Sequence, residues 1–329
     1  MSPSACDTHF HSNRTRRGEH MTQTSHLTWR IGTTIVTRIE ELLGPAFRPQ
    51  ELLSAFDPAV LEEHLHWMAP HHYVAATDQF IMSVHSWLIQ TPDHNILVDT
   101  CCGNAKNRPA SPHFHQLGTP YLDRLRSAGL EPADIDYVLC THLHVDHVGW
   151  NTRLVDGRWV PTFPNARYVF SREELNFWNP SHNPHLPEEP RDVFTDSVLP
   201  VIAAKQEQVV STTDQLGDNL LIEPAPGHSP GHVILRLLSG EDEGLFIGDV
   251  MHNPIQVYRP DWSSRFCMNP EQAMQSRLRV LGHCAEHNSL MFPAHFGIPH
   301  GGRIRSRANG FSFVPEEAQQ DAPLPKRDT

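Results

Sequence analysis

The first clear hydrophobic pattern in the chain lies at residues 27–40, which are rich in isoleucine, valine and threonine. Their partial alternation with polar residues predicts one or two strands with a buried face. Apolar runs at 80–90 and 96–98 flank a Pro-Asp turn and predict a pair of strands. A further run at 135–140 has the length of a buried strand. Other predicted strands are a hairpin with an Asp-Gly turn at 155–160, and the segments 167–170, 209–210, 220–222, 233–238, 245–247 and 290–292.

Helical signals alternate with these strands. Ser171 and Glu174 form the Ser-x-x-Glu pattern of a capping box and predict a helix that runs to about Trp178. Residues 42–78 are punctuated by proline and histidine, and we interpret them as an insertion over the edge of a sheet, with a helix at 49–67. The other predicted helices are 121–128, 193–206 and 271–286.

Composition separates the two ends of the chain from its middle. The first 26 residues are polar and have no apolar stretch behind their arginines, which predicts a disordered tail at 1–26 rather than a secretory signal. Residues 313–329 are dominated by Pro, Glu, Gln, Asp and Lys and are predicted to form a second disordered tail. No apolar run reaches the roughly 18 residues of a membrane span, so no membrane partner is expected.

Cysteine use and charge limit the surroundings and the partners of the protein. The chain has six cysteines and no Cys-x-x-Cys, so free thiols in a reducing, cytoplasmic compartment are expected. The formal net charge is −12, and beyond the first 26 residues the basic side chains cluster only at 303–307. A nucleic-acid partner is therefore disfavoured, because a surface that follows phosphates needs grouped positive charge.

The segment 141–149 carries the strongest chemical signal. His142, His144, Asp146 and His147 place four potential metal ligands within six residues, directly after the predicted strand at 135–140. Strand ends are where α/β folds usually place their chemistry. Imidazole suits zinc and other first-row metals, and a carboxylate adds an oxygen ligand. The chain holds 24 histidines, so stray ones are common, but the dense H-x-H-x-D-H spacing favours a metal site over a histidine-rich surface loop.

One more motif precedes this segment in the chain and three follow it. Asp99 closes an early apolar run, His228 stands in Pro-Gly-His-Ser-Pro-Gly-His, Asp249 in Leu-Phe-Ile-Gly-Asp and His295 in Phe-Pro-Ala-His-Phe. Together with H-x-H-x-D-H, these motifs resemble the metallo-β-lactamase-fold hydrolases over residues 83–297.

The resemblance implies a mixed α/β (α+β) fold, the four-layer αββα sandwich, in which 42–78 is an N-terminal helical insertion. Residues 27–312 are then expected to form a single catalytic domain, because ligands as distant as 142 and 295 must converge on one site. The family fold is a duplicated unit, although no internal repeat is visible in this sequence.

The resemblance also divides the ligands between two divalent metal ions, most simply zinc, with Mn, Fe or Co as alternatives set by supply. It implies that His142, His144 and His228 hold one ion and that Asp146, His147 and His295 hold the other. Asp249 would bridge the two ions. A hydroxide shared by the metals would then attack the substrate, with Asp146 orienting it and passing a proton to the leaving group.

Three further residues receive supporting roles. Asp99 is expected to fix a ligand imidazole, with a turn or helix cap as the alternative. His232 is expected to brace the loop of His228, and His252 is a candidate substrate-facing acid at a position where some lactonases of this fold carry tyrosine. The stretch 67–73 is expected to line the substrate pocket.

The motifs favour the branch of lactonases and methyl-parathion-type hydrolases. The common β-lactamases carry cysteine where this chain has Asp249, and flavodiiron relatives carry an acid where it has His144. We therefore predict a binuclear hydrolase of small neutral esters: lactones, carboxylesters or phosphotriesters. A glyoxalase II-like thioesterase, a hydrolytic dehalogenase of activated aromatics and a non-catalytic metal-binding module are the alternatives. A small molecule is the expected partner, and a homodimer is compatible with the family.

Overall fold

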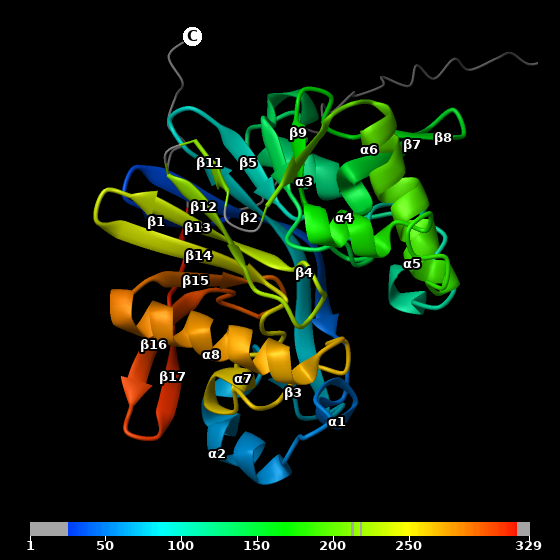
Figure 1. The fold of residues 1–329 in the computed structure, drawn as a ribbon. Coiled ribbons are helices and arrows are strands. Elements are labelled where there is room, and N and C mark those ends of the chain that lie inside the picture. Colours follow the sequence, from blue (N-terminus) through cyan, green and yellow to red (C-terminus); the bar gives the residue numbers. More distant parts are fainter. Residues whose placement is uncertain (1–25, 212–213, 218, 321–329) are drawn as a thin grey trace, which may run out of the picture.

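Two β-sheets form the centre of the computed structural model, which describes residues 26–211, 214–217 and 219–320 (Figure 1). The first sheet has nine strands, of which eight follow one path and β3 pairs with β4. Along this path the strands are β10 (Glu207–Val210), β9 (Arg167–Ser171), β6 (Tyr137–Leu139), β5 (Asn95–Val98), β4 (Gln79–Gln90), β2 (Thr34–Pro45), β1 (Leu27–Ile31) and β18 (Gln319–Gln320), and β3 is Tyr73–Val74.

The second sheet has seven strands in sequence order. They are β11 (Gln215–Leu216), β12 (Leu220–Pro224), β13 (Val233–Ser239), β14 (Asp242–Gly248), β15 (Leu290–Pro293), β16 (Gly302–Arg307) and β17 (Gly310–Pro315). A separate hairpin joins β7 (Thr152–Val155) to β8 (Arg158–Pro161), and both turn residues, Asp156 and Gly157, have positive φ angles. That turn is the predicted Asp-Gly turn, whose two left-handed residues match the twist of the strands.

Helices cover the outer face of each sheet. The α-helices are α1 (Pro49–Leu52), α2 (Pro58–Met68), α3 (Tyr121–Ser127), α4 (Arg172–Trp178), α5 (Glu188–Val193), α6 (Leu199–Ala203), α7 (Ile255–Tyr258) and α8 (Pro270–His287). Short 3-10 helices occur at Pro112–Phe114, Pro132–Asp134 and Gly149–Asn151, and a π-helix at Phe194–Val198. In Figure 1, α8 lies across the second sheet, and α3 and α4 lie beside the first.

Side-chain alternation along single strands explains the four layers. On β4, Leu88 packs under the helices of the first sheet, whereas its neighbours Trp87 and Ile89 pack against the second sheet. On β14, Phe246 enters the core between the sheets and Leu245 packs on the α8 side. Because successive strand residues point to opposite faces, each sheet is buried twice. The predicted αββα sandwich is thereby confirmed, and residues from both sheets share one core, in keeping with the single domain that we propose for 27–312.

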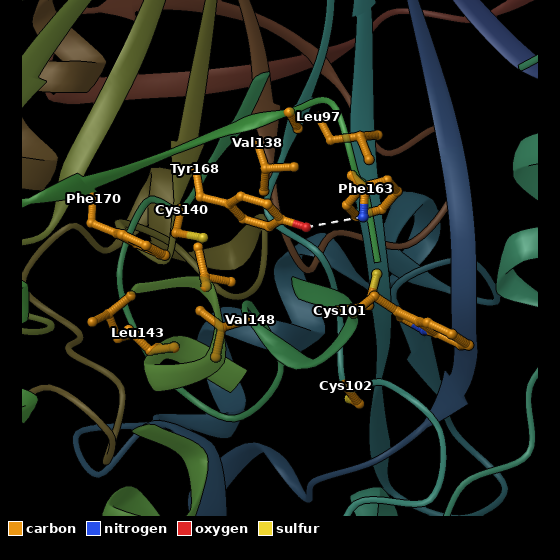
Figure 2. Close-up of a cluster of buried hydrophobic side chains, with 14 of the residues drawn as sticks. Leu97, Cys101, Cys102, Val138, Cys140, Leu143, Val148, Phe163, Tyr168 and Phe170 are labelled. Atoms are coloured by element: carbon orange, nitrogen blue, oxygen red, sulfur yellow. Dashed lines mark hydrogen bonds between the residues drawn. The ribbon is translucent and has the colours of Figure 1, made fainter. Parts of the chain in front are cut away.

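The predicted H-x-H-x-D-H loop is anchored in the helix-side core of the first sheet. Figure 2 shows Leu143 and Val148 within the same cluster as Val138, Cys140 and Phe170. Leu143 is 3% exposed and Val148 is fully buried. Leu143 and Val148 therefore hold the loop on the core, while His144, Asp146 and His147 between them are presented at the strand end.

Three predicted segments differ from the structure. The helix expected at 49–67 is two helices, because Asp57 is extended and its side chain accepts a hydrogen bond from the Ala59 amide to start α2, with Pro58 in the first turn. The insertion is also shorter than 42–78, since β2 continues to Pro45. The helix expected at 193–206 is interrupted by the π-helix, at which Asp196 turns inward to buried basic residues.

The predicted disordered tail at 313–329 is wrong in its first part. Phe313 is buried in β17, where its ring packs against Trp67 and Phe296, and Gln319–Gln320 pairs with β1, while 321–329 lie outside the described residues. The basic run at 303–307 lies in the strand β16, in which Ile304 is buried and Arg305, Ser306 and Arg307 are exposed. Of the predicted N-terminal tail 1–26, the structure describes only residue 26. In the described ranges, no helix has both the length and the apolar character needed to cross a bilayer.

Candidate metal centre

The ends of four strands or strand connections carry the predicted ligands to one place. The H-x-H-x-D-H segment follows β6, and Asp249 follows the last residue of β14. His295 lies two residues beyond β15, which runs parallel to β14. His228 lies in the connection from β12 to β13. All seven predicted ligands meet at this edge, although the first and the last are 153 positions apart (295 − 142).

The first ligand set is a tight group of three imidazoles. His144 Nδ1 lies 3.0 Å from His142 Nε2 and 2.8 Å from His228 Nε2. Asp249 Oδ2 lies 3.2 Å from His228 Nε2 and 3.7 Å from His142 Nε2. Burial holds the pKa of both His142 and His228 well below the ordinary value. This direction favours the neutral ring, which is the form of imidazole that binds a metal.

The second ligand set forms around the other oxygen of Asp249. Asp249 Oδ1 lies 3.0 Å from His295 Nε2 and 3.2 Å from His147 Nε2. The Asp146 carboxylate lies 3.6 Å from His295 Nε2 and 3.7 Å from His147 Nε2. Asp249 thus presents one oxygen to each set, the arrangement expected of a bridging ligand. Burial alone would raise its pKa, but the surrounding imidazoles, His295 first, hold the pKa well below the usual range.

The donor atoms fit a pair of divalent cations. His147 Nε2 and Asp249 Oδ1 are both buried and have no hydrogen-bond partner. An unpartnered buried polar atom costs about 1–3 kcal/mol, which a bound cation would remove. Imidazole and carboxylate are also the ligands that zinc and related metals take in hydrolytic sites.

Buried partners fix the orientation of the ligand residues. Asp99 Oδ2 lies 2.9 Å from His147 Nδ1, and its Oδ1 accepts a hydrogen bond of 2.7 Å from the Thr141 amide. The predicted contact of Asp99 with a ligand imidazole is therefore present, and the cap alternative is not. His295 Nδ1 contacts the Ser83 carbonyl oxygen at 2.9 Å. His232 Nε2 accepts a hydrogen bond of 3.0 Å from the Asp249 amide, as its predicted bracing role requires.

Asp99→Asn is expected to weaken metal binding in the second set by about 10- to 100-fold, the usual cost of losing a partner behind a ligand. The amide can place an N–H against the Thr141 amide or against His147, so one of the two contacts is lost. Zinc titration in the presence of a competing chelator measures this. Equal weakening of both sets would contradict the assignment of Asp99 to His147.

His252 lies closer to the ligand residues than contact with a substrate alone would require. Its Nε2 lies 3.2 Å from Asp249 Oδ2, and neither ring nitrogen has a hydrogen-bond partner. Its donor atoms also group with those of Asp249 and His295. Burial lowers the pKa of His252, which favours a neutral ring. The predicted role of His252 as a substrate-facing acid stays a proposal.

A cavity of about 670 Å³ opens above the ligand residues. His144, Asp146, His228, Asp249, His252 and His295 lie in its wall. The rest of the lining is largely apolar and comes from β4, α4, α5 and the connections between elements: Phe47, Met82, Phe114, Phe177, Trp178, Leu186, Val193, Phe266 and Met268.

The prediction that 67–73 lines the pocket is wrong. Trp67 packs against Tyr258 and Phe313, and Met68 and Tyr73 are buried in a hydrophobic cluster that the insertion shares with Ile255 and Trp262. From the predicted insertion 42–78, Phe47 alone among the described residues lines the cavity. The actual walls lie in irregular loops such as 110–114 and 183–190, where no periodicity marks a functional residue.

The position of Glu174 next to the metal ligands could not be predicted from the sequence either. Ser171 caps α4 as predicted, since its hydroxyl accepts a hydrogen bond of 3.3 Å from the Glu174 amide. The Glu174 side chain does not complete the capping box. It is fully buried and accepts four hydrogen bonds, from the amides of Leu143 and Gly231 and from the side chains of Trp178 and Ser229.

Comparison with known proteins adds to this geometry. The family model described as the metallo-beta-lactamase superfamily matches residues 81–285. The N-acyl homoserine lactonase AttM of Rhizobium johnstonii is 32% identical over 103 residues, which are 28% of this chain and 35% of that protein. The chain thus spans about a third of that curated relative.

Two solved structures share the fold over nearly their whole length. Hydrolase AbOPH of the beta-lactamase superfamily has a TM-score of 0.74 at 22% identity, covering 90% of this chain and 98% of its own. AidC, a dizinc quorum-quenching lactonase in complex with a product, has a TM-score of 0.71 at 22% identity, covering 90% and 99%. With the fold, the ordered motifs and a family match over more than half of its length, this chain belongs to the metallo-β-lactamase superfamily.

Proposed function

We propose that the protein is a binuclear metal-dependent hydrolase of small, neutral ester-type substrates: lactones, carboxylesters or phosphotriesters. The observation that carries the proposal is the position of the two ligand sets, joined by Asp249, in the wall of a largely apolar cavity. Relatives named as N-acyl homoserine lactonases, and a dizinc lactonase of the same fold, support the lactone class.

The residues would divide the work as follows. His142, His144 and His228 would hold one divalent cation, Asp146, His147 and His295 the other, and Asp249 would contact both. When bound, such cations lower the pKa of water and polarise a carbonyl or phosphoryl oxygen. Asp146 lies in the cavity wall with a carboxylate able to accept and return a proton. His252 would orient the substrate from beside Asp249, and the apolar walls would exclude water.

The charge of the cavity favours an uncharged substrate. Among the described residues that line it, Arg265 is the sole lysine or arginine, and Glu189 opposes it with a negative charge. A thioester of glutathione or coenzyme A would bring several negative charges and would need grouped basic side chains. The thioesterase alternative is therefore the weaker proposal.

The decisive experiment is metal analysis of the purified protein with hydrolysis of an acyl-homoserine lactone, p-nitrophenyl acetate and methyl paraoxon. About two metals per chain are expected, with at least one probe hydrolysed. Treatment with a chelator should abolish hydrolysis, and added zinc should restore it. Hydrolysis that survives complete metal removal would overturn the proposal, as would a fully active protein with a single metal.

Phe266→Ala should lower kcat/KM about tenfold for a long-chain acyl-homoserine lactone and leave a short-chain lactone nearly unchanged. Phe266 is 38% exposed at the cavity wall, packs against Phe47 at 5.5 Å between ring centroids and stacks near His252. Covering this ring with an apolar acyl chain stabilises the bound substrate by up to about 1.5–3 kcal/mol, depending on the apolar area buried. Equal losses on both lactones would instead indicate a disturbed metal centre.

A further inference from the structure

Two separate loops supply the first ligand set, and a single buried carboxylate joins them. His142 and His144 flank Leu143, whose amide donates a hydrogen bond of 3.0 Å to Glu174 Oε2. His228 precedes Ser229, whose hydroxyl donates to Glu174 Oε1 at 2.5 Å, and Gly231 donates its amide to the same oxygen at 2.8 Å. Each oxygen of Glu174 thus serves one of the two histidine loops.

The fourth donor extends this connection to the cavity. Trp178 Nε1 donates a hydrogen bond of 2.7 Å to Glu174 Oε2. The Trp178 ring lies in the cavity wall, edge-on to His144 at 5.2 Å between centroids. Four donors satisfy both oxygens of an ionised carboxylate, and burial makes each of these bonds costly to lose.

The backbone of the His228 loop is built to approach this carboxylate. A Cβ atom at Gly231 would lie 2.5 Å from the Glu174 backbone nitrogen and 2.7 Å from the Ser171 hydroxyl. Only glycine therefore lets the loop rest directly on the start of α4. The close contact keeps the Gly231 amide within reach of the carboxylate.

We propose that Glu174 is the positioning residue of the first ligand set, which sets the His142–His144 loop and the His228 loop at the spacing that one metal ion needs. This inference rests on the proposed binuclear function. The second set depends less on Glu174. Asp146 and His147 share the loop of Leu143, but His147 is also held by Asp99, and His295, on another strand connection, is held by the Ser83 carbonyl. Loss of Glu174 should therefore weaken zinc binding by the first set more than zinc binding by the second.

The test is Glu174→Gln in the full-length protein, titrated with zinc against a competing chelator. The amide keeps one acceptor oxygen and turns an NH₂ group toward donors, so one loop loses its partner. Zinc affinity of one site should fall about 10- to 100-fold while the other stays within about threefold of the parent. Adding His295→Ala to Glu174→Gln should remove the remaining tight site, whereas adding His144→Ala should not.

Glu41→Gln is the matched control. Glu41 is also a buried glutamate, and it accepts hydrogen bonds from the Cys102 amide, Trp150 Nε1 and the Thr119 hydroxyl. None of these donors lies in either histidine loop. The control should lose stability without a selective loss of zinc. If Glu41→Gln shows the same one-site loss, or if Glu174→Gln weakens both sites equally, Glu174 acts only through general stability and the inference is overturned.

Two further measurements keep the test decisive. If Glu174→Gln does not fold, Ser229→Ala takes its place. This variant removes one donor to Glu174 and should weaken the same site severalfold. Hydrogen exchange of the Leu143 and Gly231 amides in metal-free protein should be faster in Glu174→Gln than in the parent. Two zinc ions in the parent with unchanged affinities in Glu174→Gln would overturn the inference alone. Fewer than two zinc ions in the parent would overturn the proposed binuclear function, and unchanged amide exchange would then refute the bracing of the loops separately.

Discussion

Replacing Asp249 with asparagine is expected to reduce hydrolysis by at least about 10³-fold and to release both metal ions under chelator competition. Asp249 is the one residue with an oxygen in each ligand set, at 3.0 Å from His295 Nε2 and 3.2 Å from His228 Nε2. Asparagine has nearly the same shape but one acceptor oxygen and no charge. Loss of a single preorganised electrostatic contact already costs about 10²–10³ in rate, and here two sets lose their shared ligand.

The matched control for this variant is Asp242→Asn, at the exposed start of the same strand, β14. Asp242 makes a surface hydrogen bond with the Gly32 amide, and its replacement should leave metal content and kcat/KM unchanged. Metal analysis and initial rates on the lactone probe give both readouts. An Asp249→Asn protein that keeps two metals and turns over within tenfold of the parent would remove Asp249 from the mechanism.

The ligand residues could be predicted from the sequence because their chemistry is local. The H-x-H-x-D-H segment stands directly after an apolar run that predicts a buried strand, and its spacing alone indicates a metal site. The ligand roles of His228, Asp249 and His295 are predicted through the resemblance of their motifs to the family. Parallel strands such as β14 and β15 end at the same edge, so residues after both strands must meet. The resemblance also predicts the supporting role of Asp99, which leaves β5 with a left-handed φ of 58° and reaches His147.

The walls of the cavity and the role of Glu174 could not be predicted in this way. Glu174 meets Leu143, Ser229 and Gly231 across 31 to 57 positions of sequence. In the sequence it looks like the last residue of a capping box, which is a local and correct description of Ser171 alone. Aromatic content also misled the prediction at Trp67, because an apolar ring satisfies a core as well as a pocket.

The connection between the two loop walls of the cavity is equally hidden in the sequence. The loop that contains Ala110 to Phe114 is held by Arg108, whose guanidinium donates to Asp196 Oδ1 at 2.6 Å and to Oδ2 at 2.8 Å. Lys106 contacts the same carboxylate at 3.3 Å, and burial lowers its pKa to about 8. Asp196 lies in the π-helix beside α5, which carries the opposite wall, and Ser111 donates to Glu189 across the gap at 2.7 Å. One aspartate is thus the shared counter-ion of two buried basic side chains and links both walls.

Asp196→Ala should lower the free energy of unfolding by about 3–5 kcal/mol, because it leaves the buried charges of Arg108 and Lys106 without a counter-ion. Urea denaturation of the zinc-loaded protein measures this. The control is Asp261→Ala, which breaks the exposed Arg259–Asp261 pair and should cost about 1 kcal/mol or less. Because Asp196 contacts no ligand residue, the variant should retain two metals while KM for the long-chain lactone rises. A loss of unfolding free energy no greater than that of the control would show that Lys106 and Arg108 find other partners, and that the two walls are held together by something else.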